Sequence, residues 1–297
     1  MLKLRIALFP TMLTLIISLS ENVGYAQNAS KRNVAVQQTS TTGDEIPALY
    51  IARVISVSRA TRDDFFNCLQ QNELPVWRQL KRDGLLADES VFEVTSVQTT
   101  ERGVPSWEVL LLTHLAPTAK QDSFVQAEKK RLRTPRCEDA PGAETRRVEV
   151  LRSTPKSYYP RATSEEDRQA LQAKVEFFIE YIAVNGTPTA LNQYRESMRV
   201  NMGPAMGLLI PDKWFFNLIA LETVSVLYAQ PGMANWNQIH IRGYFPEKGP
   251  TPTAIDAALR RVNPSGGGSA GFFGSLESIR TLRREDITHQ LFDLTVR

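Results

Sequence analysis

The sequence predicts an α+β fold in which one β-α-β-β-α-β unit occurs twice in tandem. Three observations lead to this prediction: an internal repeat, the same order of strands and helices in both halves, and a composition typical of globular proteins. Of the 297 residues, 42% are hydrophobic and 23% are charged, which excludes a disordered or fibrous protein. The formal net charge of +3 is too small to indicate nucleic acid or an anionic membrane surface as a partner.

The repeat becomes visible when the chain is compared with itself at an offset of 129 residues. Twelve residues are then identical over 64 positions without a gap, where chance would give about three or four. The matches that are rarest by chance involve tryptophan and proline: Trp107 with Trp236, Pro75 with Pro204 and Pro117 with Pro246. The offset therefore indicates a duplicated unit.

The first copy, residues 47–153, begins with a strand over 48–57 that is rich in β-branched residues. Thr61 is a plausible cap for a long helix with an acidic first turn, and apolar residues then recur at helical spacing. A strand pair over 90–98 and 107–115, a polar helix over 123–133 and a closing strand over 147–152 complete the unit. Pro75 should kink or break the long helix, as should Pro204 at the equivalent place.

The second copy, residues 170–297, follows a polar, proline-containing linker over 154–169. Its expected strands span 175–184, 217–228, 236–245 and 286–296, and its expected helices span 189–200 and 253–262. The glycine-rich run 265–269 is typical of a flexible linker. Phe272 and Phe273 after it are expected to act either as a lid over a cavity or as a plug under a helix that begins at Ser275.

The first 46 residues indicate an exported protein. Residues 1–26 combine a short basic start, an apolar stretch and small residues before a cut after Ala26, which is typical of a signal peptide. Residues 27–46 are polar and are expected to be a flexible lead-in. No second apolar run of spanning length follows, so we expect a periplasmic or secreted product without a membrane anchor after cleavage.

The β-α-β-β-α-β order is that of the ferredoxin-like fold. The two helices of such a unit run antiparallel on one sheet face, so the start of the first and the end of the second lie at the same end. Cys68 and Cys137 occupy these two places, and an oxidising compartment permits a disulfide between them. The alternative is two unrelated free thiols, and no cysteine cluster indicates a zinc site.

Two tandem ferredoxin-like units with long kinked first helices resemble the dimeric α+β-barrel superfamily. That superfamily includes antibiotic-biosynthesis-type monooxygenases, NIPSNAP-like proteins and the chlorite dismutase group. The resemblance implies that the two sheets face each other as a barrel around a cavity. Its monooxygenases and isomerases use the cavity without a bound metal, and its haem-binding branch places an axial histidine on a helix. His114, His240 and His289 all fall on predicted strands, so we expect neither haem nor another cofactor, and no metal.

Strand alternation selects the candidate site residues. In the second copy, Ile239 and Ile241 are expected to meet the helices, so the alternate residues face the space between the sheets: Trp236, Gln238, His240, Arg242 and Tyr244. By alignment of the strands, Arg53, Glu93, Glu180 and Glu222 join them around one cavity.

These residues allow two interpretations. His240 is a candidate proton acceptor tuned by Glu222, and Arg242 is a candidate group for holding an anionic oxygen. Equally, the charges are salt-bridge pairs that hold the two sheets together.

Three functions from different classes remain open. The first is a protein that binds a small, aromatic or anionic molecule. The second is a cofactor-independent monooxygenase or isomerase that uses the same cavity. The third is a non-catalytic interaction or assembly protein, since exposed sheet edges pair with other chains. The sequence leaves open whether the chain forms a homodimer and whether the barrel closes within one chain or between two.

Overall fold

The computed structural model describes residues 47–117, 121–131, 137, 140–154, 175–209, 215–244 and 252–291. The expected signal peptide, lead-in and most of the linker lie outside these residues. The chain divides into two units, residues 1–44 and 45–297, and the second contains all the described residues. In the described part of the chain, no helix is both long enough and apolar enough to cross a membrane.

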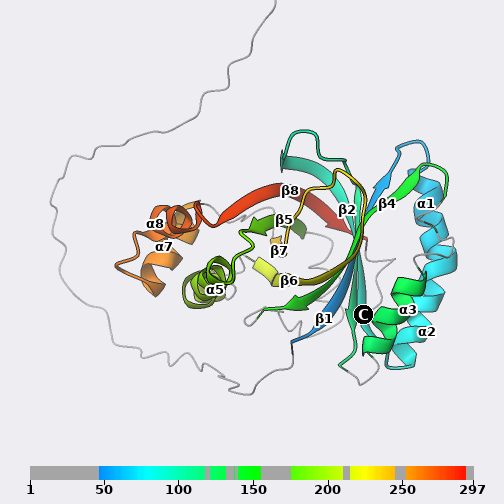
Figure 1. Ribbon diagram of the computed structural model, residues 1–297, viewed down its shortest axis with the longest axis horizontal. Helices are drawn as coiled ribbons and strands as arrows, with labels where there is room; N and C mark the ends of the chain where they lie inside the picture. Colours follow the sequence, from blue (N-terminus) through cyan, green and yellow to red (C-terminus); the bar gives the residue numbers. More distant parts are fainter. Residues whose placement is uncertain are drawn as a thin grey trace, which may run out of the picture. The chain divides into compact units, whose positions relative to one another are not determined.

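Eight antiparallel strands of the described residues form a closed barrel (Figure 1). Their bounds are β1 Leu49–Val57, β2 Leu86–Thr100, β3 Val109–Leu115, β4 Ala143–Ser153, β5 Glu176–Val184, β6 Phe215–Ala229, β7 Gln238–Tyr244 and β8 Arg280–Gln290. The strand order is β1-β3-β2-β8-β5-β7-β6-β4. The chain therefore holds a half-barrel β4-β1-β3-β2 and a half-barrel β8-β5-β7-β6. They join through the pairs β2–β8 and β4–β6, so the barrel closes within one chain.

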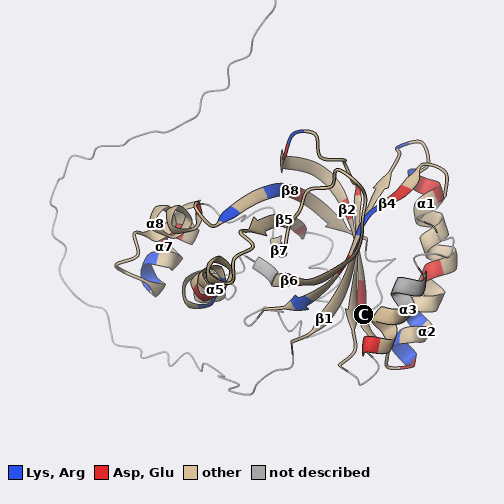
Figure 2. Ribbon diagram, in the orientation of Figure 1, with Lys and Arg blue, Asp and Glu red and all other residues tan. Residues whose placement is uncertain are grey.

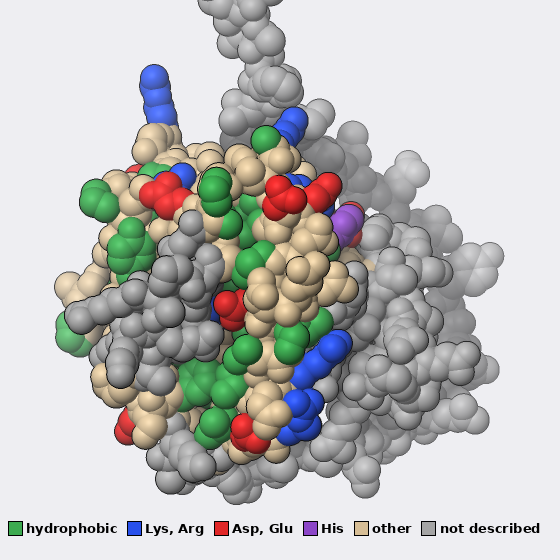
Figure 3. Space-filling model, turned by 90° about the vertical axis from the view of Figure 1, so that its right-hand side faces the viewer, with side chains coloured by type: hydrophobic (Ala, Val, Ile, Leu, Met, Phe, Trp, Pro, Cys, Tyr) green, Lys and Arg blue, Asp and Glu red, His purple; other side chains and the backbone are tan. Residues whose placement is uncertain are grey.

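Helices cover the outside of both half-barrels (Figure 1). On the first half they are α1 Arg62–Cys68, the π-helical turn η1 Leu69–Glu73, α2 Leu74–Arg82 and α3 Gln121–Arg131. On the second they are α5 Pro188–Ser197, the π-helical turn η3 Met198–Met202, α6 Gly203–Leu209, α7 Pro252–Val262 and α8 Gly268–Leu276. The surface that carries α1 and α2 mixes acidic, basic and apolar side chains (Figure 3), as the small net charge would suggest.

Both long helices change geometry at the expected prolines. Pro75 and Pro204 each follow a π-helical turn and sit in the first turn of the next helix. Proline lacks an N–H and clashes with the preceding turn, and the wider π turn accommodates this without ending the helix. The expected capping bond of Thr61 is absent, because its hydroxyl lies 2.7 Å from that of Ser58.

Two expectations for the C-terminal part were wrong. The last strand, Arg280–Gln290, begins at Arg280 and not at Asp286, because Arg284 and Asp286 form a buried pair and do not mark a surface loop; the expected residues 292–296 lie outside the described residues. The glycine-rich run is a turn that leads into α8, and α8 also contains Phe272 and Phe273. A Cβ at Gly271 would lie 2.0 Å from the carbonyl oxygen of Gly266, so glycine is what permits this tight turn into the helix.

The assignment of strand faces was also wrong, because it was inverted. Ile239 and Ile241 pack inside the barrel with Trp107, Trp236 and other strand residues of both halves. The alternate residues of β7 point outward to the helices. Both faces of β7 are buried, the inner one apolar and the outer one partly polar, so alternation alone does not tell which face is inside, and a wrong choice reverses every side chain.

Two buried clusters tie the half-barrels together inside the barrel. Arg147 of β4 donates to Glu149 (2.8 Å) and to the carbonyl of Trp236 (2.8 Å), and its guanidinium lies 4.1 Å above that indole ring. Glu149 also accepts from the indole N–H of Trp236 at 2.7 Å. The arginine and the glutamate come from the first half and the tryptophan from the second.

The second cluster reverses these contributions. Arg284 of β8 donates to Asp286 (2.6 Å) and to the carbonyl of Trp107 (2.7 Å), and its guanidinium lies 3.7 Å above the Trp107 ring. The two tryptophan rings then contact each other at 5.4 Å between centroids. Burial raises the pKa of Asp286 to about 6, against the charge of Arg284.

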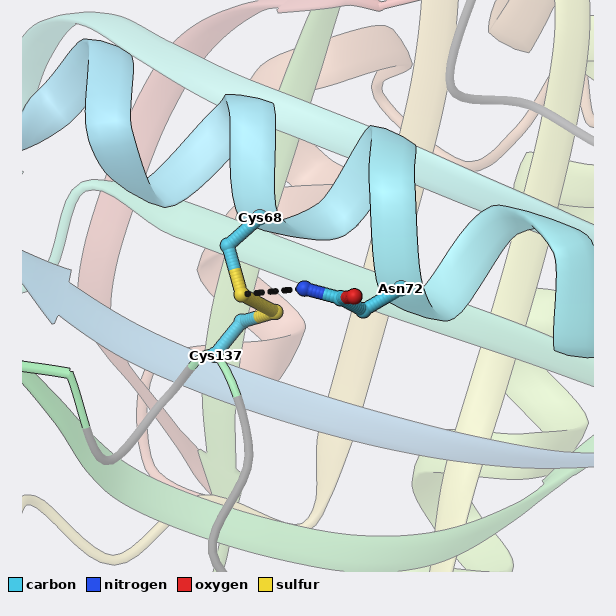
Figure 4. The surroundings of a disulfide bond; sticks show 3 residues. All are labelled: Cys68, Asn72 and Cys137. Carbon is cyan, nitrogen blue, oxygen red and sulfur yellow. Dashed lines mark hydrogen bonds between the residues drawn. A yellow bond between two sulfur atoms is a disulfide. The ribbon is translucent and has the colours of Figure 1, made fainter.

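The disulfide between Cys68 and Cys137 is confirmed (Figure 4). It joins the end of α1 to the chain beyond α3, with the two Cα atoms 5.7 Å apart, and Asn72 donates to the Cys68 sulfur at 3.4 Å. The bridge closes a loop of 69 residues and so restricts the unfolded chain.

Glu149→Gln should lower the free energy of unfolding by about 3 kcal/mol, because it leaves the buried Arg147 charge without its carboxylate. Adding Arg147→Met should recover part of this loss. Urea unfolding of the two single variants and the double variant measures the coupling, and strictly additive costs would contradict the assignment. Glu196→Gln is the matched control: its partner Arg199 is exposed, so this variant should change stability little.

Candidate functional site

A cavity of about 650 Å³ lies on the outer face of the second half-barrel. Strands β5, β6 and β7 form its floor, and α5, η3, α6 and α8 form its walls. Its apolar lining comes mainly from three methionines, two phenylalanines and a leucine: Met198, Met202, Met206, Phe272, Phe273 and Leu218. Figure 2 shows the charged segments of the surrounding elements.

The structure brings five of the nine candidate residues together in this cavity: Glu180, Glu222, Gln238, His240 and Arg242. They meet there because they share the outward face of their strands, and not because the sheets enclose a space. The inside of the barrel is instead packed with apolar side chains.

The other four candidates lie outside this cavity. The prediction of a single cavity between the sheets is therefore wrong. Arg53 is buried on the first half-barrel beside Glu89, 3.6 Å away. Glu93 pairs with Arg62 of α1. Trp236 lies inside the barrel, and Tyr244 packs on the helix side with its hydroxyl donating to Glu176 at 3.1 Å.

Glu222 does not tune His240, contrary to expectation. It binds two arginines, accepting from Arg152 at 2.7 Å and from Arg195 at 2.7 and 2.5 Å. Burial raises the pKa of Glu222, but the hydrogen bonds from Arg195 and Arg152 outweigh it and bring the pKa below its ordinary value. Glu222 is therefore a charged anchor between β4, β6 and α5.

His240 is held between Tyr194 of α5 and Glu180 of β5. Its Nε2 lies 3.3 Å from the Tyr194 hydroxyl, and its Nδ1 lies 3.8 Å from a Glu180 oxygen. Burial lowers the pKa of His240 to about 4, against the attraction of Glu180. Burial also raises the pKa of the Tyr194 hydroxyl far above its ordinary value. At neutral pH the imidazole is neutral and the tyrosine is protonated.

Glu180 is the second charged anchor of the floor. Arg242 pairs with it at 3.0 Å and extends over the Phe178 ring at 5.7 Å. Burial raises the pKa of Glu180, but Arg242, His240 and Arg280 outweigh it, so the pKa lies below its ordinary value. The carboxylate is ionised at neutral pH.

Sequence reasoning missed the helix side of the cavity. Tyr194 and Arg195 of α5 contribute to it, and neither stood out in the sequence, nor did Arg280 at the start of β8. Met198, Met202 and Met206 recur every four residues, which is the spacing of one helix face. That stripe was a readable signal for an apolar wall.

The histidines do not fit an axial ligand of haem. Among the described residues, no group of three or more His, Cys, Asp or Glu side chains is placed to hold a metal ion. His114, His240 and His289 lie on β3, β7 and β8. His240 alone lines the cavity, and its two nitrogens already face Tyr194 and Glu180. We therefore assign no step to haem.

No protein-family model matches the chain, and no curated protein matches it. Among solved structures, the chain is similar to an anthrone oxidase-like protein, with 10% identity and a TM-score of 0.45, over 83% of this chain and 93% of that chain. It is also similar to a dye-decolorizing protein from V. cholerae, with 9% identity and a TM-score of 0.44, over 84% and 96%.

A third similar structure is a chlorite dismutase from Candidatus Nitrospira defluvii, with 11% identity and a TM-score of 0.42, over 84% of this chain and 94% of that chain. At these TM-scores the similarities say nothing of activity. The narrower resemblance to antibiotic-biosynthesis-type monooxygenases and NIPSNAP-like proteins stays a prediction.

The buried His240 should make stability depend on pH. Its folded pKa of about 4 lies below the ordinary 6.5, so its contribution is present above pH 6.5 and is lost as pH falls through 4. The loss should reach about 3 kcal/mol. Urea unfolding between pH 7 and pH 4 measures it. His240→Gln should remove this part of the pH dependence, while His289→Gln, at a half-exposed position, should keep it. An unchanged dependence in His240→Gln would refute the assignment.

Proposed function

We propose that this chain is an exported protein that binds a small molecule in the cavity between β5, β6 and β7 and the helices α5, α6 and α8. The observation that carries the proposal is the cavity itself. Its volume of about 650 Å³ falls in the range of known ligand sites, about 300–1,000 Å³, and mostly apolar walls with a few charged groups are typical of such sites.

The protonation states favour binding over catalysis. A general base works best when its pKa lies near the working pH. The pKa of His240 is about 4, so at neutral pH it is a weak proton acceptor. Tyr194 holds its proton. The polar floor is therefore suited to orienting a ligand, and the monooxygenase or isomerase alternative has less support.

The assembly alternative also has less support. Its premise was a free sheet edge, and in the described residues each half-barrel pairs both of its outer strands with the other half. A homodimer is not needed to complete the barrel, and the oligomeric state stays a prediction.

We further propose that the two half-barrels are duplicated ferredoxin-like copies, over 47–153 and 170–297. The bounds of β6 and β7 equal those of β2 and β3 shifted by 129 residues, and η3 equals η1 shifted by the same number. The strand orders β4-β1-β3-β2 and β8-β5-β7-β6 also correspond. The reversed arginine, acid and tryptophan clusters support the same conclusion.

On this alignment the first copy has apolar side chains where the second copy has its cavity floor. Where it has His240 and Gln238, the first copy has Leu111 and Val109, which pack with Phe65, Leu69 and Trp77 of its helices. Trp77 stands where the second copy has Met206, and only 2% of it is exposed. The first copy is thus packed at the place where the second is hollow.

Export can be tested on the full chain, leader included, produced in a Gram-negative bacterium. We expect the periplasmic product to have the intact mass of residues 27–297, less two hydrogens for the Cys68–Cys137 bridge. The bridge fits an oxidising compartment. An uncleaved product retained in the cytoplasm would contradict export, and a mass that increases on thiol alkylation without reduction would contradict the bridge.

The cavity can be tested with N-phenyl-1-naphthylamine, an uncharged apolar dye whose fluorescence rises in apolar sites. We expect one site per chain. Ala220→Phe places a ring on the cavity floor and should weaken binding at least tenfold. Val224→Phe is the matched control on the same strand, where Val224 is 54% exposed and outside the cavity. Absence of dye binding, or equal loss in both variants, would refute the proposal.

A further inference from the structure

We propose that the ligand of this cavity is an organic anion with an apolar body, whose anionic group pairs with Arg280 above the polar floor. This inference rests on the proposed function and names the class of ligand. It is carried by the charge balance of the lining, by the partners of each arginine, and by the apolar walls.

The lining has an excess of positive charge. Five arginines contribute to it, at positions 152, 195, 199, 242 and 280, and three glutamates, at positions 180, 196 and 222. Five minus three leaves two positive charges, and His240 adds none at neutral pH because its pKa is about 4. A cationic ligand would meet net repulsion here, while an anion would be attracted.

The pairing of the arginines locates this excess. Glu222 binds both Arg152 and Arg195, Glu196 binds Arg199, and Glu180 binds Arg242. Arg280 is different: in the described part of the chain, no carboxylate oxygen lies within 4.0 Å of it. Its guanidinium acts on Glu180 only through space, hydrogen-bonds with the Tyr194 hydroxyl and stands 5.3 Å from the Phe273 ring centre.

Two donors of the floor also lack a hydrogen-bond partner in the described residues. They are Nε2 of Gln238, a side chain that is 1% exposed, and Nε of Arg242. Buried donors are nearly always satisfied in native proteins. Oxygen acceptors brought by an anion would complement this end of the cavity.

The walls determine the rest of the ligand. Met198, Met202 and Met206 line one side, and Phe272 and Phe273 of α8 line another. Thioether side chains are flexible and polarisable, so they adapt to ring or chain shapes and make favourable contacts with aromatic groups. An apolar body lies against these walls while its anionic group faces Arg280.

The test compares two dyes that share one skeleton. 8-Anilinonaphthalene-1-sulfonate is N-phenyl-1-naphthylamine with one added sulfonate, so the pair isolates the negative charge. We expect the sulfonate dye to bind at least tenfold more tightly, with both dyes lost in Ala220→Phe. Arg280→Met should abolish the tenfold preference for the sulfonate dye over the uncharged dye.

Arg283→Met is the matched control, on the same strand but outside the cavity, where Arg283 pairs with Glu101. It should keep the preference. Glu180→Gln removes a competing negative charge and should tighten sulfonate binding severalfold, a gain that a purely structural role would not produce. Near-ultraviolet circular dichroism checks that each variant is folded. If Arg280→Met does not fold, the comparison of Glu180→Gln with the unchanged protein still tests whether the cavity prefers an anion.

The outcomes separate the two proposals. Binding of neither dye overturns the proposed function and this inference with it. Equal binding of both dyes, or weaker binding of the sulfonate, overturns the anion while the binding site stands. A preference that survives Arg280→Met overturns the assignment of Arg280.

Discussion

The contact of a buried arginine in each half-barrel with a tryptophan of the other half is the constraint on which the rest of the structure depends. Arg147 and Arg284 are each about 2% exposed, and each donates to the backbone carbonyl of a tryptophan from the other half and lies over its indole ring. A buried arginine that lost these contacts would keep its carboxylate partner but leave a buried donor without an acceptor, which costs free energy. Each half therefore needs a tryptophan of the other half to complete the hydrogen bonding of its buried arginine, which couples the two halves across the seams β2–β8 and β4–β6.

This closed interior determines where a ligand can lie. Trp107, Trp236 and Tyr181 fill the middle of the barrel, with ring centroids 5.0–5.4 Å apart. Only the outer faces under the helices remain for a site. On the first half, Trp77 and the helix held by the disulfide pack onto the sheet. On the second half, methionines and a polar floor leave a cavity.

The sequence allowed the elements to be predicted better than their orientation. The predicted bounds of β3 and β7 lie within two residues of the observed ones. The disulfide was predicted from the antiparallel arrangement of the two helices. The inside and outside of the strands could not be read, because Ile239 and Leu218 are equally apolar on opposite faces. The start of β8 was misplaced because Arg284 resembles a surface residue in a sequence, although its contacts with Asp286 and Trp107 bury it. Such pairing depends on a residue 177 positions away.

The charges that line the cavity also determine the orientation of the proposed ligand. Burial removes the charge of His240, so the floor gains no cation there. Glu222 is fully engaged by Arg152 and Arg195, so it does not compete with a ligand at that wall. The cationic group without a close carboxylate is then Arg280, at the start of β8 and beside the Phe273 ring. An amphipathic anion is oriented accordingly, with its charge towards β8 and its apolar body along the methionines of η3 and α6. Reversing it would place the anion against thioethers and leave the arginine facing hydrocarbon, which costs free energy at both ends.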